Sequence, residues 1–156
     1  MTASAPAILD ASLIGFEAAP SRITVEPVQL RLFLKAIGET DRFPDKTAAG
    51  DRGITIPPTY LFCLHMTAAG DGYYDFYTDR GIAIGRLLHG EHHVTYHRPV
   101  CLGDTLLFRL RIADVALKKG GALTVMVEEI RVENNTGLLV AEIRNTVVVQ
   151  NDGVAA

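Results

Sequence analysis

The feature that most constrains this fold is a short segment that is apolar on nearly every side. Residues 59–70 read TYLFCLHMTAAG and end at a glycine. A helix that is apolar around its whole circumference lies inside a protein rather than on its surface. The rest of the chain must therefore supply elements that cover a helix at this position.

After about residue 84 the sequence alternates between apolar and polar side chains, which is typical of β-strands. We predict a run of four antiparallel strands that ends near residue 149. The last three are predicted at residues 105–115, 122–132 and 138–149. The alternation slips at Glu128 and Glu129, which predicts a bulge in the middle strand of these three. A buried helix followed by a long antiparallel meander predicts an α+β fold in which the sheet wraps around the helix.

The segments on either side of the buried helix predict one further helix and two loops. Residues 27–37 predict a short helix, because a proline occupies its first position and a glycine follows it. Residues 38–53 are polar and predict a loop with one helical turn near 45–49. Residues 71–81 are rich in tyrosine and lie between glycines, and they predict a second loop.

Length and charge narrow the class of protein. The 156 residues suffice for one domain, which we expect to span 1–156 with an ordered core from about 13 to 150. The net charge of −3 argues against nucleic acid or an anionic membrane as the main partner, because both need a basic patch.

Cysteine usage and the N-terminal residues predict a cytoplasmic protein. Cys63 and Cys101 each lie in an apolar segment, as expected of buried thiols in an intracellular protein. The first residues lack the charged and apolar regions of a signal peptide, and no apolar run is long enough to span a bilayer.

Four of the five histidines cluster in one segment, at positions 89, 92, 93 and 97. The segment begins beside Gly90, contains β-branched and aromatic residues and ends at a proline, so it predicts a strand. On a strand His93 and His97 share one face and His92 lies on the other. No cysteine or histidine elsewhere completes a ligand set, so we predict no metal site.

Two of these histidines are candidates for lining a substrate site. His89 lies next to Gly90, where a backbone can approach a ligand closely. His92 points to the opposite face from His93 and His97, which we interpret as half-exposed strand residues. His89, Gly90 and His92 are therefore the substrate-binding candidates of this segment.

The segment LLHGEHHVTYHRPVCLGDTL at residues 87–106 resembles the signature of the MaoC-like dehydratases, in particular the N-terminal-type half of that family. The stretches YTDRGIAIG and GITIPPTYLF are similar to the same family, and the resemblance covers roughly residues 15–149. It implies the hot-dog fold, a long antiparallel sheet curled around a central helix. This agrees with the α+β fold expected from the apolar pattern.

The resemblance also implies chemistry on acyl thioesters of coenzyme A or acyl carrier protein, with no further cofactor. The expected reaction is the reversible hydration of a trans-2-enoyl thioester to a 3-hydroxyacyl thioester. The catalytic half of the family carries a G-D-x-N-P-x-H loop whose Asp and His perform the acid–base steps. In this chain Gly38 matches, Glu39 stands at the Asp position, Asp41 stands at the Asn position and Asp45 comes nearest to the histidine.

This departure leaves two interpretations of the loop. In one, Glu39 or Asp41 is catalytic, with His65, His89 or His92 as the second group, since an apolar tunnel raises the pKa of a carboxyl group. In the other, the loop is polar surface and the chain is a non-catalytic partner in a dehydratase heterodimer. Hydrolysis by an acyl-CoA thioesterase is a neighbouring alternative on the same fold.

The start of the buried helix predicts a binding element for the thioester oxygen. Two prolines precede Thr59 and Tyr60, whose N–H groups are expected to lack partners at the helix N-terminus. The alternative is an ordinary capped core helix.

Other side chains and the sheet edge leave further roles open. The aromatic residues of 71–81 suit an acyl pocket, a lid or a dimer seam, and Arg109 and Arg111 suit either the phosphates of coenzyme A or a solvated face. An unpaired sheet edge predicts a homodimer or higher oligomer, or a heterodimer with a catalytic hot-dog subunit.

Overall fold

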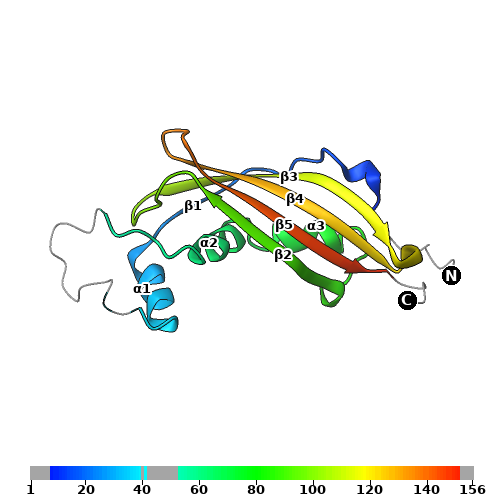
Figure 1. Ribbon diagram of the computed structural model, residues 1–156, viewed down its shortest axis with the longest axis horizontal. Helices are drawn as coiled ribbons and strands as arrows, with labels where there is room; N and C mark the ends of the chain where they lie inside the picture. Colours follow the sequence, from blue (N-terminus) through cyan, green and yellow to red (C-terminus); the bar gives the residue numbers. More distant parts are fainter. Residues whose placement is uncertain (1–7, 40, 42–52, 152–156) are drawn as a thin grey trace.

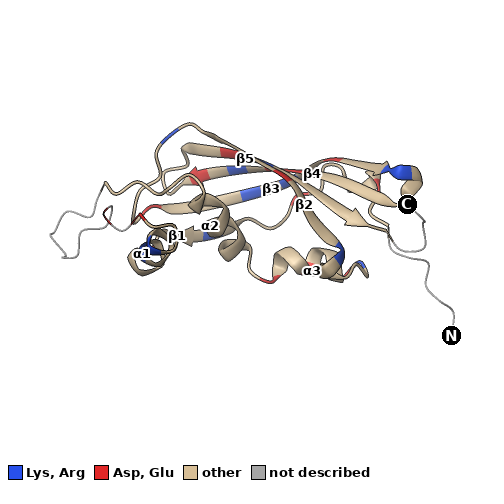
Figure 2. Ribbon diagram, turned by 60° about the horizontal axis from the view of Figure 1, so that its bottom comes forward, with Lys and Arg blue, Asp and Glu red and all other residues tan. Residues whose placement is uncertain are grey.

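The computed structural model describes residues 8–39, 41 and 53–151. Within these residues a five-stranded antiparallel sheet is accompanied by three α-helices, and Figure 2 shows α2 and α3 on the same side of the sheet. The strands are β1 (Ser21–Thr24), β2 (Leu87–Tyr96), β3 (Thr105–Lys118), β4 (Leu123–Asn134) and β5 (Leu139–Gln150). The helices are α1 (Pro27–Ala36), α2 (Tyr60–Ala69) and α3 (Gly72–Thr78), with short 3-10 turns at Ala11–Leu13, Ile84–Arg86 and Lys119–Gly121. The predicted α+β class is confirmed.

The strand order is β1-β3-β4-β5-β2, as Figure 1 shows. Strands β3, β4 and β5 form the predicted meander, but β2 pairs with β5 rather than with β3. The prediction of four antiparallel strands is therefore confirmed, whereas the meander order is wrong for β2, because alternation along the chain does not specify which strands pair. The short strand β1 was not predicted, since four residues carry too little pattern. Strands β1 and β2 form the two edges of the sheet.

The core lies between the inner face of the sheet and α2. Leu61 and Leu64 of α2 are fully buried against Phe108, Ile130 and Ile143 from the three central strands. The alternation of these strands places such residues on one face, because successive side chains point to opposite faces. The opposite side of α2 is only half-buried, so the prediction of a helix covered on every side is not met within one chain.

The loop predicted at 71–81 is wrong, because the structure has helix α3 there. Tyr77 of this helix has no exposed surface and packs in a second apolar cluster with Met126, Ile112 and Val147. Tertiary burial of an aromatic side chain thus overrides the turn signals of the neighbouring glycines and aspartates. The helical turn predicted at 45–49 lies outside the described residues.

The bulge predicted at Glu128 and Glu129 lies on the neighbouring strand instead. Ile112 pairs with Glu128 and Asp114 pairs with Val127, so the extra residue is Ala113 of β3. Strand β4 keeps its alternation through this point, and Glu128 points to the inner face. Glu128 is a polar residue on the apolar, inner face of β4, and in the sequence it looks like a break in the alternation of that strand.

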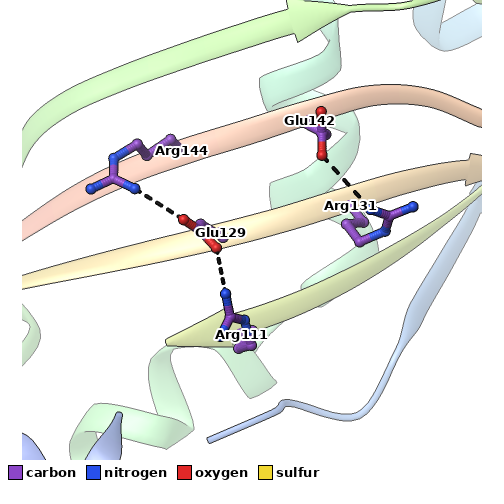
Figure 3. Close-up of polar contacts among 5 residues, drawn as sticks. All are labelled: Arg111, Glu129, Arg131, Glu142 and Arg144. Atoms are coloured by element: carbon purple, nitrogen blue, oxygen red, sulfur yellow. Dashed lines mark hydrogen bonds and ion pairs between the residues drawn. The ribbon is translucent and has the colours of Figure 1, made fainter. Parts of the chain in front are cut away.

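The outer face of the sheet carries a ladder of ion pairs, shown in Figure 3. Glu129 receives hydrogen bonds from Arg111 at 2.7 Å and from Arg144 at 3.0 Å, and Arg131 lies 3.7 Å from Glu142. Arg109 likewise pairs with a glutamate, Glu133. These exposed pairs contribute little stability each. Both Arg109 and Arg111 therefore belong to a solvated face, which favours that alternative over contact with coenzyme A.

No helix among the described residues is long and apolar enough to cross a membrane.

Gly90 lies at a bulge in the pairing of β2 with β5. A Cβ atom at this position would lie 3.1 Å from the carbonyl oxygen of Thr146 and 3.2 Å from a methyl of Val148. We predict that Gly90→Ala lowers the free energy of unfolding by about 1 kcal/mol, because the crowded atom belongs to the backbone of an interior strand. Urea unfolding measures this, with Gly85→Ala as control, since no atom of the described residues lies within 4 Å of that added Cβ. Equal unfolding midpoints for the two variants would contradict the close approach.

Candidate active site

A pocket of about 560 Å³ lies between the inner face of the sheet and helices α2 and α3. Its walls are more apolar than polar. A glutamate, two tyrosines and a histidine contribute polar atoms, and so do Ser21, Asp75, Asp79 and Arg80. The main lining residues are Phe16, His65, Ala69, Tyr73, Phe76, Tyr77, Phe108, Leu110, Ile112 and Glu128. Mostly apolar walls with a few convergent polar groups are typical of ligand sites, as is a volume in this range.

Three side chains donate hydrogen bonds to the carboxylate of Glu128, which is only 2% exposed. The hydroxyl of Tyr77 lies 3.1 Å from Oε1, and the hydroxyl of Tyr73 lies 3.4 Å from both carboxylate oxygens. The amide nitrogen of Asn145 donates to Oε2 at 3.2 Å. These donors satisfy a group whose burial without partners would cost several kcal/mol.

The surroundings of Glu128 shift the pKa values of the whole cluster. Burial raises the pKa of Glu128, and the hydrogen bonds from Asn145, Tyr77 and Tyr73 oppose that shift in part. Burial, followed by the nearby carboxylate, raises the pKa of both tyrosines well above the usual range. Tyr73 and Tyr77 therefore remain protonated donors at neutral pH.

His65 of α2 also lines this pocket, and it is 2% exposed. Its ring packs against Phe108 with centroids 5.3 Å apart and lies edge-on to Tyr73 at 6.2 Å. Burial, with a smaller contribution from nearby His92, lowers the pKa of His65 to about 4. Its Nδ1 atom is buried and has no hydrogen-bond partner among the described residues. His65 is therefore neutral at physiological pH.

Of the predicted residues on β2, His92 joins the Glu128 cluster. Its Nδ1 lies 2.6 Å from the amide oxygen of Asn145. His89 and His92 both contact the ring of Phe62 edge-on, at 5.5 Å and 5.0 Å. Gly90 approaches the neighbouring strand β5 closely, which explains the glycine without a ligand. Substrate contact by these three residues stays a prediction.

At the start of α2 we expected the N–H groups of Thr59 and Tyr60 to lack partners, and the structure differs from this at Tyr60. The N–H of Tyr60 donates to the carbonyl of Pro57 at 3.0 Å, so the expectation is wrong for this amide. The ring of Tyr60 is buried against Phe33, with centroids 4.7 Å apart. Thr59 occupies the N-cap position of α2 and is exposed. Its side chain makes no capping hydrogen bond to the described part of the helix. Thr59 thus remains the candidate of the two that is open to a ligand.

The two candidate catalytic carboxylates lie apart from this pocket. Glu39 follows the end of α1, where its N–H donates to the carbonyl of Leu34 at 2.9 Å, and its side chain is exposed. Asp41 is also exposed. Neither residue lines the Glu128 pocket. Asp45 lies outside the described residues, and a catalytic role for Glu39 or Asp41 stays a prediction.

Sequence reasoning missed the centre of the pocket, although a signal was present. Glu128 is in phase with the apolar residues Met126 and Ile130, and Asn145 is in phase with Ile143 and Val147. A polar residue on the apolar face of a strand indicates a buried and satisfied polar group.

Within the described ranges, no group of three or more His, Cys, Asp or Glu residues could hold a metal ion.

The depressed pKa of His65 predicts a loss of stability in acid. The folded state binds a proton at His65 only near pH 4, whereas the unfolded state binds it near 6.5. Stability contributed by the neutral ring is therefore present above pH 6.5 and is lost as the pH falls to 4, by about 3 kcal/mol. Urea unfolding from pH 7 to pH 4 measures this loss.

The matched comparison is His65→Phe, which removes the titrating group. The raised pKa of Glu128 acts in the opposite direction, since its contribution is lost as the pH rises above 4.5, so only the difference between the two proteins is diagnostic. We expect the acid loss to shrink in His65→Phe and to persist in His97→Gln, where an exposed ring pairs with Glu142. Equal pH slopes for wild type and His65→Phe would contradict burial of a neutral His65.

Comparison with known proteins extends over most of the chain. The family model described as FAS1-like, dehydratase domain region, matches residues 12–143. A UPF0336 protein of Streptomyces coelicolor is 33% identical over 103 residues, which cover 63% of this chain and 67% of that protein. A UPF0336 protein of Saccharopolyspora erythraea is 32% identical over 131 residues, covering 80% of this chain and 83% of that one.

Solved structures confirm the hot-dog fold and the resemblance to MaoC-like dehydratases. The HadBC complex of Mycobacterium tuberculosis, a 3R-hydroxyacyl-ACP dehydratase, matches with a TM-score of 0.68 and 26% identity, over 90% of this chain and 99% of that chain. A MaoC-like dehydratase from Rhodospirillum rubrum matches with a TM-score of 0.64 and 16% identity, over 90% and 94%. The chain belongs to the FAS1-like dehydratase-region family of hot-dog proteins.

Proposed function

We propose that this chain is a subunit of a hydratase or dehydratase that interconverts trans-2-enoyl and 3-hydroxyacyl thioesters. The thioester would be carried by coenzyme A or acyl carrier protein, with no other cofactor. Membership of a dehydratase-region family supports this reaction class. The likeness to the 3R-hydroxyacyl-ACP dehydratase complex supports the same substrate class.

The observation that carries the proposal is the apolar pocket around Glu128. Phe16, Phe76 and Phe108 form walls that an acyl chain can contact, and α2 and α3 close one side. Burial of an acyl chain is worth about 0.8 kcal/mol for each CH₂ group, so such walls supply most of the binding energy of a fatty thioester.

The start of α2 supplies a place for the thioester carbonyl. Thr59 is exposed there, and the partial positive charge of a helix N-terminus favours an oxygen that becomes enolate-like during proton removal at C2. From Thr59, α2 runs toward the pocket. Ala68 and Ala69, at the C-terminal end of α2, belong to the lining of that pocket. An extended acyl thioester along α2 would connect the two places.

The open edge of β2 supports assembly with a second hot-dog subunit. Among the residues that the structure describes, this strand pairs with β5 alone, and its histidine-rich segment is exposed. Phe62 of α2, which contacts His89 and His92, is only half-buried beside the same edge. A second subunit at β2 would extend the sheet and cover this side of α2. We propose a homodimer or a heterodimer with a catalytic chain.

A second candidate role is that of a non-catalytic, substrate-lining partner. The sequence has no histidine between residues 38 and 64, where the catalytic half of the family carries one. Glu39 and Asp41 are exposed, so in the single chain neither side chain lies in an apolar tunnel. In this role the chain would bind the acyl thioester while another subunit performs the proton transfers.

We predict that filling the pocket changes the preference for acyl chain length. Ala69→Phe should lower kcat/KM for a long-chain trans-2-enoyl-CoA about tenfold and leave a short-chain substrate within about threefold, because only the long chain reaches the occupied space. Hydration is followed by loss of the enoyl-thioester absorbance, and release of free thiol is followed in parallel. Leu117→Phe is the control, since it adds the same ring at an exposed position of β3.

The outcomes separate the candidate functions. Equal losses for long and short substrates would contradict the pocket as the acyl site. Free thiol without hydration would identify a thioesterase. Saturable binding of the long-chain thioester with no turnover by the chain alone would identify the non-catalytic partner.

A further inference from the structure

A row of three polar residues crosses neighbouring strands on the inner face of the sheet. Glu128 of β4 is opposite Asn145 of β5, and Asn145 is opposite His92 of β2. Glu128 and Asn145 are 2% and 1% exposed, and the row continues on β3 with the apolar residue Ile112. Adjacent strands lie about 4.8 Å apart, so side chains in one row on the same face reach each other.

The direction of the hydrogen bonds along this row fixes the protonation of His92. Asn145 turns its NH₂ group to the Glu128 carboxylate at 3.2 Å, so its oxygen faces His92 Nδ1 at 2.6 Å. An amide oxygen only accepts, and Nδ1 must therefore carry the hydrogen. In the neutral ring the lone pair then belongs to Nε2.

The two hydroxyls of α3 strengthen this orientation. Tyr73 and Tyr77 both donate to Glu128, so its carboxyl oxygens act as acceptors, and these bonds oppose in part the rise in pKa that burial causes. The NH₂ group of Asn145 is the third donor to this carboxyl group, and its amide oxygen is therefore the atom that faces His92. The orientation of His92 thus depends on a carboxylate two strands away.

The position of His92 differs from those of His65, His93 and His97. His93 lies on the outer face of the sheet, where it lines a groove with Arg109 and Arg131. His97 pairs with the exposed Glu142. His65 is buried and hard to protonate. His92 is exposed on the edge strand β2, lies against Phe62 of α2 and is joined through Asn145 to Glu128, which lines the pocket.

We propose that His92 is the acid–base residue of the thioester reaction, held by Asn145 and Glu128 as positioning residues. This inference rests on the proposed function. In dehydration Nε2 takes the proton from C2 as the C2–H bond breaks, and that electron pair forms the C2–C3 double bond. The C3–O bond breaks, and the imidazolium returns the same proton to the departing oxygen, which leaves as water. The ring ends neutral, so the step needs no other reactant.

The first test measures the tautomer and is independent of turnover. Long-range ¹H–¹⁵N correlation spectra of histidine-labelled protein should show His92 as the Nδ1–H form, with the signal assigned by its loss in His92→Gln. In Glu128→Gln the amide of Asn145 is free to turn, so the signal should shift toward the Nε2–H form. Asn145→Ala should release the ring in the same way. A wild-type ring in the Nε2–H form, or one unchanged in both variants, overturns the positioning array.

The second test measures hydration of a trans-2-enoyl-CoA. His92→Gln keeps a side chain that can hydrogen-bond to Asn145 but removes the base, so kcat should fall by about 10²-fold or more. Glu128→Gln should lower kcat about tenfold with KM changed by less than about threefold. His93→Gln, on the outer face, should stay within about twofold. Wild-type kcat in His92→Gln overturns the acid–base role.

The two tests distinguish failure of this inference from failure of the proposed function. A fixed Nδ1–H ring in a protein without hydratase activity would support the array and overturn both the acid–base role and the enzymatic assignment. Activity that survives His92→Gln would support the proposed function and overturn this inference alone. Thermal unfolding of each variant confirms that losses of activity are not losses of fold.

Discussion

The burial of the Glu128 carboxylate is the constraint on which this structure depends. A carboxyl group on the apolar face of a sheet is tolerated only when hydrogen-bond partners surround it. Here those partners come from α3 and from β5, so the helix and the strands must both be in place before the carboxylate is satisfied. A shift of one residue in the pairing of β4 with β5 would turn Glu128 or Asn145 to the other face and leave its partner without a hydrogen bond.

The same constraint links the fold to the site. Tyr73 and Tyr77 hold α3 against the sheet through Glu128, and the pocket lies between this helix, α2 and the central strands. Asn145 extends the network to His92 at the open edge. The polar row therefore joins the acyl-sized pocket to the strand at which a second subunit is expected, whereas the ion pairs of the outer face contribute to neither.

The sequence predicted the elements of the fold better than it predicted the centre of the site. The all-round apolar pattern located α2, and alternation located β3, β4 and β5, because burial on one face leaves a periodic signal. The pairing of β2 with β5 and the helical state of α3 depend on tertiary contacts that no local pattern contains. Glu128 was mistaken for a break in alternation, and His92 was a candidate whose partner Asn145 becomes evident only from the register of β2 with β5.

The most direct test of this account is a crystal structure with a non-hydrolysable thioether analogue of a long-chain 3-hydroxyacyl-CoA. We expect acyl carbons against Phe76 and Phe108 in the Glu128 pocket, with the C3 hydroxyl about 3 Å from His92 Nε2. An analogue bound elsewhere, with the pocket unfilled and His92 distant from C2 and C3, would contradict this expectation.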